Sequence, residues 1–302
     1  MNIRLKFFLQ FCTVIYSTFA SIIETSILYR SFNLNILGTF FLLQSSTILL
    51  SSILSIRIVE TTQVLLNKFG LSERKAYEQF SKLYSFYLII LIPLIPLSLI
   101  LIPFFKDIYK YNILTILLSL LFISSTIILN KLTGVWYAFQ YFKNKSQNIS
   151  FYELTKKLIS ILLIYLIYLF KPSSYEIIYI SLAYFLKSFL FFIYEFNIIY
   201  PLIKSKIIYS FKKPLKIFKE FTISNTDISS SIKSSYLRNL FSSIVKNSDI
   251  AIAGIIAGPA GSSLVKIIKS VPTIILQPSQ YINNFSISYI NRSRKSYRNL
   301  YN

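Results

Sequence analysis

The chain consists largely of long apolar blocks that are separated by short polar segments. A transmembrane helix needs about 20 predominantly apolar residues. By this rule the predicted spans cover residues 7–28, 37–57, 84–105, 112–131, 155–170, 175–200, 230–257 and 262–289. The pattern therefore predicts an all-α, polytopic membrane protein with about eight transmembrane helices.

The composition excludes a soluble domain and most catalytic chemistry. Of the 302 residues, 54% are hydrophobic and only 14% are charged, whereas soluble domains carry roughly 25% charged residues. There is no histidine, and Cys12 is the only cysteine. Histidine-dependent triads, imidazole or thiolate metal sites and internal disulfides are thereby excluded. We expect no enzymatic activity, no metal and no cofactor.

The net charge of +21 suggests nucleic acid or a membrane surface as a partner. Sorting the basic residues by the positive-inside rule decides between them. With a cytoplasmic N-terminus, most basic residues fall in cytoplasmic segments, and only Arg30, Lys106, Lys110 and Lys171 fall on the other side. We therefore predict membrane lipids, and not nucleic acid, as partners, and a multi-pass protein whose N-terminus is cytoplasmic.

Three segments on the predicted cytoplasmic side have their own pattern. Residues 58–83 and 132–157 have apolar positions at helical spacing, which is typical of amphipathic interfacial helices, and Trp136 is expected at headgroup level. Residues 202–219 are rich in lysine. We predict a six-helix lobe over 1–206, a basic linker over 207–220 and the first two helices of a second lobe over 221–302.

Charged residues inside the predicted spans are the candidates for function, because such residues usually mark a cavity or pathway. Arg238, Ser242, Lys246 and Asp249 lie on one helical face of the seventh span, and the eighth span carries Lys266 and Lys269. Lys246 and Asp249 also fit simple mutual neutralisation, and Lys266 fits snorkelling to the membrane surface.

Further polar positions recur at helical spacing in the first, second and sixth spans. They are Thr13, Ser17 and Glu24; Gln44, Ser51 and Ser55; and Ser181, Tyr184, Ser188 and Glu195, with Lys187 beside them. Together with the seventh and eighth spans they predict a central cavity with more cations than anions. For serine and threonine the alternative is helix packing.

Two stretches resemble a known family. Residues 247–292 have the order Asp249, Gly254, Gly258, Pro272 and then a basic segment that begins at Arg292, and residues 37–40 read Leu-Gly-Thr-Phe. This order resembles the bacterial polysaccharide flippases of the multidrug/oligosaccharidyl-lipid/polysaccharide exporter superfamily. Gly261-Ser262-Ser263 departs from the Gly-x-Tyr that is frequent there.

The resemblance implies an inner-membrane flippase with two six-helix lobes and alternating access. Its substrate would be an undecaprenyl-diphosphate-linked oligosaccharide repeat unit for surface polysaccharide, such as O-antigen, and other polysaccharide-assembly proteins are expected partners. The implied substrate-binding residues are Arg238, Lys246, Lys266, Lys269 and Lys187, and the implied coupling-ion or charge-partner residues are Asp249 and Glu24. Eight spans are fewer than the family's 12 to 14, so we expect a chain truncated at its C-terminus or a split gene product.

Three alternative functions remain, and one of them is a purely structural scaffold. A multidrug-type exporter of the same superfamily would share the fold, but it would favour acidic residues in the cavity for cationic substrates. A membrane-embedded polysaccharide polymerase or glycosyltransferase would be expected to have a large outer loop, a soluble domain or an acidic cluster. The short predicted outer loops and the excess of cations favour the flippase.

Overall fold

The computed structural model describes residues 3–55, 73–109, 112–143, 146–170, 176–212 and 226–300. Within these ranges the chain is helical, with short turns and no β-strand. The helices are α1 (Ile3–Ser31), α2 (Leu34–Leu54), α4 (Glu73–Leu91), α5 (Leu94–Leu99), α6 (Leu101–Tyr109), α7 (Ile113–Phe142), α8 (Ser146–Phe170), α9 (Glu176–Lys212) and α11 (Thr226–Leu300). The predicted all-α fold is confirmed.

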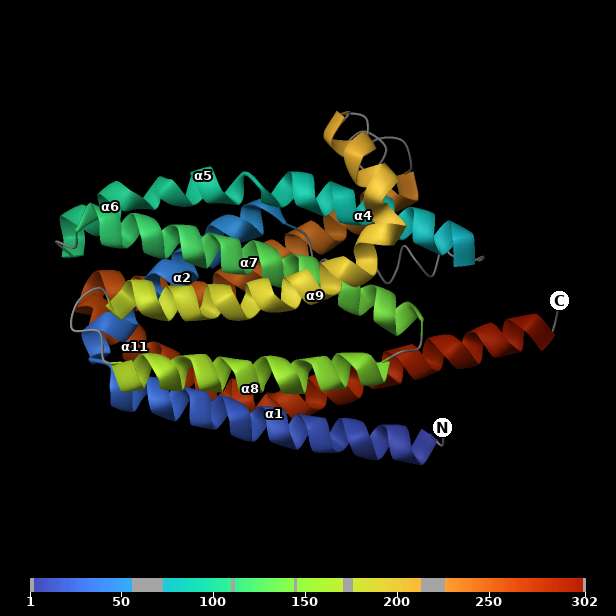
Figure 1. Cartoon of the computed structure of the whole chain (residues 1–302), viewed down its shortest axis with the longest axis horizontal. Helices are drawn as coiled ribbons and strands as arrows, with labels where there is room; N and C mark the ends of the chain where they lie inside the picture. The colour runs from blue at the N-terminus through green and yellow to red at the C-terminus, as the bar shows by residue number, and fades with distance from the viewer. Residues whose placement is uncertain are drawn as a thin grey trace.

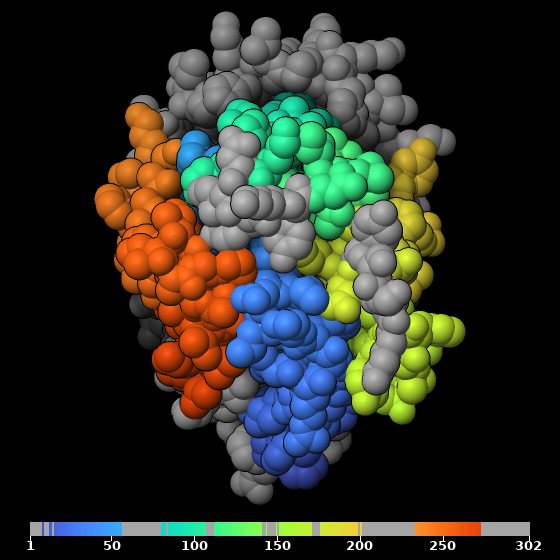
Figure 2. All heavy atoms as spheres, turned by 90° about the vertical axis from the view of Figure 1, so that its left-hand side faces the viewer, coloured from blue at the N-terminus to red at the C-terminus, as the bar shows by residue number. Residues whose placement is uncertain are grey.

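The helices run back and forth between two ends of the molecule, and the two termini lie at the same end (Figure 1). α1 packs against α8, α7 against α9, and α11 along α2, while α5 and α6 continue from α4 beside α7. At the end opposite the termini, α1 and α2 lie between α11 and α8 (Figure 2). This order of passes agrees with the order of the predicted spans.

Several helices are long and apolar enough to cross a membrane. Among the described residues these segments are Leu34–Leu54, Phe80–Lys106, Ile113–Gln140, Glu176–Ile198 and Lys233–Pro272. The last one contains the predicted seventh span and part of the eighth, while the predicted first and fifth spans coincide with α1 and α8. The polytopic membrane protein is confirmed, and the number of eight spans stays a prediction.

The turn between α1 and α2 is short and capped. The side chain of Asn33 accepts a hydrogen bond from the backbone N–H of Asn35 at 3.0 Å, which satisfies one of the free donors at the start of α2. At the other end Ser55 adopts an extended conformation and terminates the helix. The cap therefore stabilises the start of α2 directly after α1 ends at Ser31.

α11 is a helical hairpin, because Gly258 has non-helical backbone angles with φ at +73°. Glycine tolerates this conformation without steric cost. The two limbs lie antiparallel: the Ser262 hydroxyl donates to the Ile250 carbonyl at 2.9 Å, and the Lys269 ammonium donates to the Lys246 carbonyl at 2.8 Å. The tight turn predicted between the seventh and eighth spans is confirmed at Gly258.

The hairpin is fixed to the α1–α2 turn by close backbone contact. A Cβ atom at Gly38 on α2 would overlap the backbone carbonyl of Pro259 on α11. Beside this contact the Ser263 hydroxyl donates to the Leu34 carbonyl at 2.8 Å, and the Tyr29 hydroxyl donates to the Ser263 carbonyl at 3.2 Å. Glycine is therefore required at position 38, since only it allows this approach.

One predicted cytoplasmic segment differs from expectation. Residues 132–157 do not form a separate interfacial helix, because α7 continues to Phe142 and α8 already begins at Ser146. Trp136 is 2% exposed and packs on Tyr152 with 4.9 Å between ring centroids. It therefore belongs to the core and does not face lipid headgroups, since the aromatic side chains around it bury its ring.

The other predicted segment boundaries stay predictions. Of the interfacial helix over 58–83, residues 73–83 lie in α4 and residues 58–72 are outside the described residues. Of the linker over 207–220, residues 207–212 are the last of α9, and residues 213–220 are outside the described part. The division into lobes over 1–206 and 221–302 is likewise not decided by these helices.

Candidate functional site

α1 turns polar side chains into the protein and apolar ones outward. Thr13, Ser17 and Glu24 are buried, whereas Phe19 is 62% exposed and Ile23 is half exposed. This arrangement is the reverse of a water-soluble helix, whose apolar side faces the core. An apolar surface around a polar interior fits a protein with lipid outside and a polar path inside.

The predicted polar faces of α2 and α9 are also buried, but many of their hydroxyls serve the helix itself. Ser55 donates to the Ser51 carbonyl and Ser181 to the Ile177 carbonyl, both within one helical turn. Such bonds satisfy a hydroxyl without any ligand. For these serines the helix-packing interpretation is therefore the simpler one, and the charged residues remain the stronger candidates.

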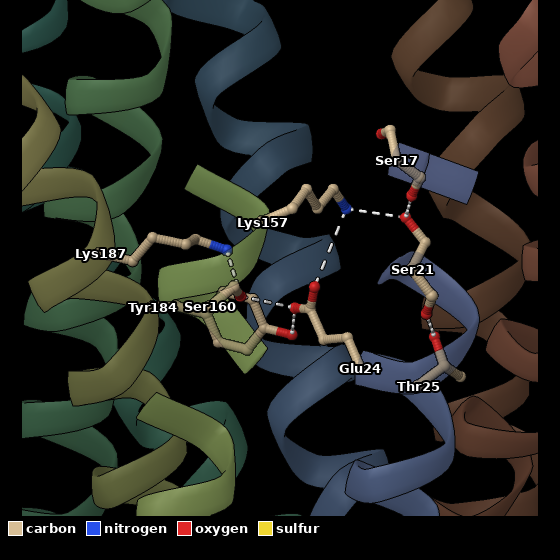
Figure 3. Close-up of polar contacts among 8 residues, drawn as sticks. All are labelled: Ser17, Ser21, Glu24, Thr25, Lys157, Ser160, Tyr184 and Lys187. Atoms are coloured by element: carbon tan, nitrogen blue, oxygen red, sulfur yellow. Dashed lines mark hydrogen bonds and ion pairs between the residues drawn. The ribbon is translucent and has the colours of Figure 1, made fainter. Parts of the chain in front are cut away.

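Glu24 on α1 is the centre of a buried polar cluster (Figure 3). Its Oε1 atom accepts hydrogen bonds from the hydroxyls of Ser160 on α8 and Tyr184 on α9, both at 2.9 Å. Its Oε2 atom lies 3.8 Å from the ammonium group of Lys157, which also donates to Ser21 Oγ at 2.8 Å. Three helices thus meet at one carboxylate.

Lys187 on α9 completes this cluster from the other side (Figure 3). Its ammonium group donates to Ser160 Oγ at 3.0 Å and lies 4.3 Å from the ring centroid of Tyr184. Ser160 therefore joins Lys187 to Glu24, and the tyrosine ring adds a cation–π contact. Lys187 and Glu24, two separately predicted site residues, are thus brought into one site, although the two side chains share partners instead of touching directly.

The charge of this cluster is unbalanced. Two ammonium groups, those of Lys157 and Lys187, surround the single carboxylate of Glu24. Unpaired charge is costly away from water, so ionisable groups inside a membrane protein usually face a cavity or bind a partner. Among the described residues the cluster is therefore a site of net positive charge inside the bundle.

Sequence reasoning missed part of this interior because it placed three lysines in cytoplasmic segments. Lys157 reaches Glu24, Lys156 donates to Asn130 Oδ1 at 3.0 Å, and Lys131 donates to Ser55 Oγ. Lys157 and Ser160 lie three residues apart and hence on one face of α8, which is the signal that identifies them. All three ammonium groups contact side chains of neighbouring helices, and their cytoplasmic placement stays a prediction.

Glu195, which was predicted on the polar face of the sixth span, forms a second buried polar site. It is 2% exposed and accepts hydrogen bonds from the hydroxyls of Thr133, at 2.9 Å, and Tyr152. These partners come from α7 and α8, while Glu195 belongs to α9. The carboxyl group therefore joins three helices and is enclosed by protein.

In α11, Asp249 and Lys269 form an ion pair between the two limbs of the hairpin. Lys269 also donates to the backbone of Lys246, so it supports the hairpin directly. The predicted neutralisation of Asp249 is therefore made by Lys269, twenty residues away, because the hairpin turn brings these two side chains together. Both side chains remain partly exposed.

The other predicted cations of α11 do not join the Glu24 cluster in the described structure. Arg238 and Lys246 are exposed, and Lys266 lies 5.6 Å from the ring centroid of Phe41 on α2. Charged groups on a membrane-spanning helix are tolerated where they face water or other protein. Arg238 and Lys246 therefore lie on the exposed surface of α11, apart from the Glu24 cluster.

Among the described side chains, no group of three or more aspartate, glutamate or cysteine residues is placed to hold a metal ion. The chain matches no protein-family model, no curated protein and no solved structure.

Proposed function

We propose that this protein is a membrane transporter that moves an anionic, lipid-linked oligosaccharide across a bacterial inner membrane. The observation that carries the proposal is the polar interior, with its excess of ammonium groups, inside an apolar surface. A channel or carrier needs such an interior, because a polar substrate cannot cross hydrocarbon unaided. A scaffold protein would have no need of buried charge.

The sign of the charge favours an anionic substrate. A diphosphate headgroup forms strong charge-assisted hydrogen bonds with lysine and arginine. Lys157 and Lys187 supply such donors inside the bundle, and Arg238 and Lys246 supply them on α11. The oligosaccharide would find hydroxyl and amide partners such as Ser160 and other polar side chains of the interior. An undecaprenyl-diphosphate-linked repeat unit combines both requirements with an apolar tail for the membrane.

The orientation follows from the basic residues. We propose that the end of the molecule with both termini faces the cytoplasm, because the segments predicted to be cytoplasmic carry most of the lysine and arginine and include the N-terminal residues. Alternating access would then expose the polar interior to either side in turn. The sequence resemblance to polysaccharide flippases supports the same assignment.

A multidrug-type exporter is the second candidate, and Glu24 and Glu195 are the observation in its favour. Both carboxylates are buried, and a cationic drug would bind such groups. However, Glu24 is already faced by two lysines, and Glu195 by two hydroxyls. A further cation would have to displace these partners, so we consider the anionic substrate the better fit.

Complementation tests the proposal. The chain would be expressed in a strain that lacks its own repeat-unit flippase, and surface polysaccharide would be measured. We expect polymer with the unchanged chain and a strong loss with Arg238→Ala, Lys246→Ala and the double variant. Lys106→Ala, on the exposed end of α6, is the matched control. Normal output from the double variant at equal protein levels would overturn the role of these cations, and no output from the unchanged chain would oppose the function itself.

A further inference from the structure

A cavity of about 270 Å³ lies between α2, α7 and α9 and adjoins the Glu24 cluster at Tyr184. Ligand pockets of drug size have about 300–1,000 Å³, so this cavity suits a smaller molecule or part of a larger one. Its wall is mixed: Phe40, Ile48, Ile123 and Ile127 are apolar, and Gln44, Thr126, Asn130, Lys131 and Tyr184 are polar or amphipathic.

The polar groups of this cavity are largely donors with spare capacity. Within the described part of the chain, the Gln44 carboxamide has no hydrogen-bond partner, and the Lys131 ammonium donates only to Ser55 Oγ, although it can donate three times. The Oδ1 atom of Asn130 accepts bonds from Lys156 and Ser188, which leaves its amide N–H groups to donate. The Lys131 ammonium has no carboxylate partner in the described structure, and the amide N–H groups of Gln44 and Asn130 can still donate. These groups together favour an anionic ligand.

The polar and apolar residues of the cavity are separated along its length. Along α7, Ile123 comes first, Thr126 and Ile127 follow, and Asn130 and Lys131 lie nearest the end with the termini. On the facing helix α2, Phe40 lies toward the opposite end and stacks on Tyr184, with 5.5 Å between ring centroids. The cation is therefore at the end of the termini, and the aromatic and aliphatic wall lies deeper.

We propose that this cavity binds an organic anion, a phosphate or carboxylate on an apolar body, with its charged group at Lys131 and Asn130 and its body against Phe40 and Ile123. The site is separate from the Glu24 cluster, although Tyr184 contributes to both, since its hydroxyl donates to Glu24. The inference does not rest on the transport function proposed above. The ligand could be the head of a lipid or a soluble organic acid, since both share this chemistry.

Thiol chemistry tests the site. Cys12 is the only cysteine of the chain and is exposed, so Cys12→Ser gives a background in which Gln44→Cys is the single thiol. In the purified full chain we expect this thiol to react faster with an anionic methanethiosulfonate than with a cationic one. Lys131→Gln should lower this preference about tenfold, because the charge lies at close range in a medium of low effective dielectric constant, whereas Lys106→Gln should leave it unchanged.

Protection identifies the ligand. We expect phenyl phosphate or farnesyl phosphate to slow the labelling of Gln44→Cys at concentrations at least tenfold below those of inorganic phosphate. Protection by farnesyl phosphate alone indicates a lipid, and protection by phenyl phosphate indicates a soluble acid. Equal protection by inorganic phosphate, or none by any of the three, would overturn the proposal. Thr126→Cys, on α7 one turn before Asn130, serves as the second thiol position if Gln44→Cys does not fold. An unreactive thiol at both positions would also overturn the proposal.

Discussion

The Ser160 hydroxyl on α8 donates to the Glu24 carboxylate on α1 at 2.9 Å and accepts a hydrogen bond from Lys187 on α9 at 3.0 Å. One small side chain thus connects an anion and a cation that belong to two other helices. This relay holds α1 and α8 to α9, and it keeps the positive charge of Lys187 beside the carboxylate. The stability of the bundle therefore depends on the polar interior that we assign to the substrate path.

Loss of the Glu24 charge should destabilise the protein. Glu24→Gln leaves two ammonium groups in the cluster without a carboxylate, which costs about 3 to 5 kcal/mol for a largely buried pair. Chemical unfolding in detergent micelles would measure the change. Glu24→Gln combined with Lys157→Met should recover part of the lost stability, because only one ammonium group then remains in the cluster without a carboxylate. Glu176→Gln at the start of α9 is the control. Stability equal to that of the unchanged chain would show that the carboxylate does not organise the cluster.

The contact between α2 and α11 should depend on Gly38. Gly38→Ala places a methyl group into the Pro259 carbonyl, so the two helices must separate. We expect a larger loss of thermal stability than for Gly258→Ala, where nothing lies within 4 Å of the added methyl group and the cost is the backbone conformation alone, about 1 to 3 kcal/mol. A Gly38→Ala variant with the same unfolding temperature as the unchanged chain would contradict the close approach of α2 and α11.

The Glu195 site should report through the only tryptophan. Tyr152→Phe removes one hydroxyl donor from the buried carboxylate and costs about 1 to 3 kcal/mol. The ring of Tyr152 packs on Trp136, so Trp136 emission reports unfolding of this region. We expect the emission of the variant to shift at a lower denaturant concentration than that of the unchanged chain. Tyr165→Phe, on an exposed part of α8, is the matched control. Identical unfolding curves for the two variants would remove Tyr152 from this role.

The Asp249–Lys269 pair should matter more for transport than for stability. Both side chains are partly exposed, and such pairs contribute only about 0 to 1 kcal/mol. We expect Asp249→Asn and Lys269→Met to unfold almost as the unchanged chain does and to lower polysaccharide output in the complementation assay. Variants that lose stability and output in parallel would indicate a purely structural pair.

The proposed orientation predicts which positions an impermeant maleimide reaches. In the Cys12→Ser background, Asn112→Cys, before the first turn of α7, should be labelled in intact cells after the outer membrane is permeabilised. Lys143→Cys, at the other end of this helix, should be labelled only after lysis. The opposite result would place the termini outside the cytoplasm.

The sequence predicted the helical class and the position of the Gly258 turn, because long apolar blocks and a glycine with a special backbone role leave local signals. It also placed Glu24 and Lys187 among the polar interior residues. It did not find Lys157, Ser160 or the pairing of Asp249 with Lys269. These contacts join residues up to 136 positions apart, and only the packing of α1 on α8 and the hairpin of α11 bring them together.

The partners of three lysine residues could not be predicted from the sequence. Lys131, Lys156 and Lys157 lie near the predicted ends of spans, where lysine normally extends into water. Their ammonium groups instead contact Ser55, Asn130 and Glu24 on neighbouring helices. Which way such a flexible side chain turns depends on the partners available, and these come from distant parts of the chain.

The most direct test of the central claim is a flipping assay with the purified chain in proteoliposomes. A fluorescently labelled undecaprenyl-diphosphate oligosaccharide would be placed in both leaflets, and dithionite would bleach the outer one. With the chain present we expect bleaching beyond the half that an inactive bilayer allows, and a return to about half with the variant carrying Arg238→Ala and Lys246→Ala. Bleaching that stops at half with the unchanged, folded chain would contradict the proposed function.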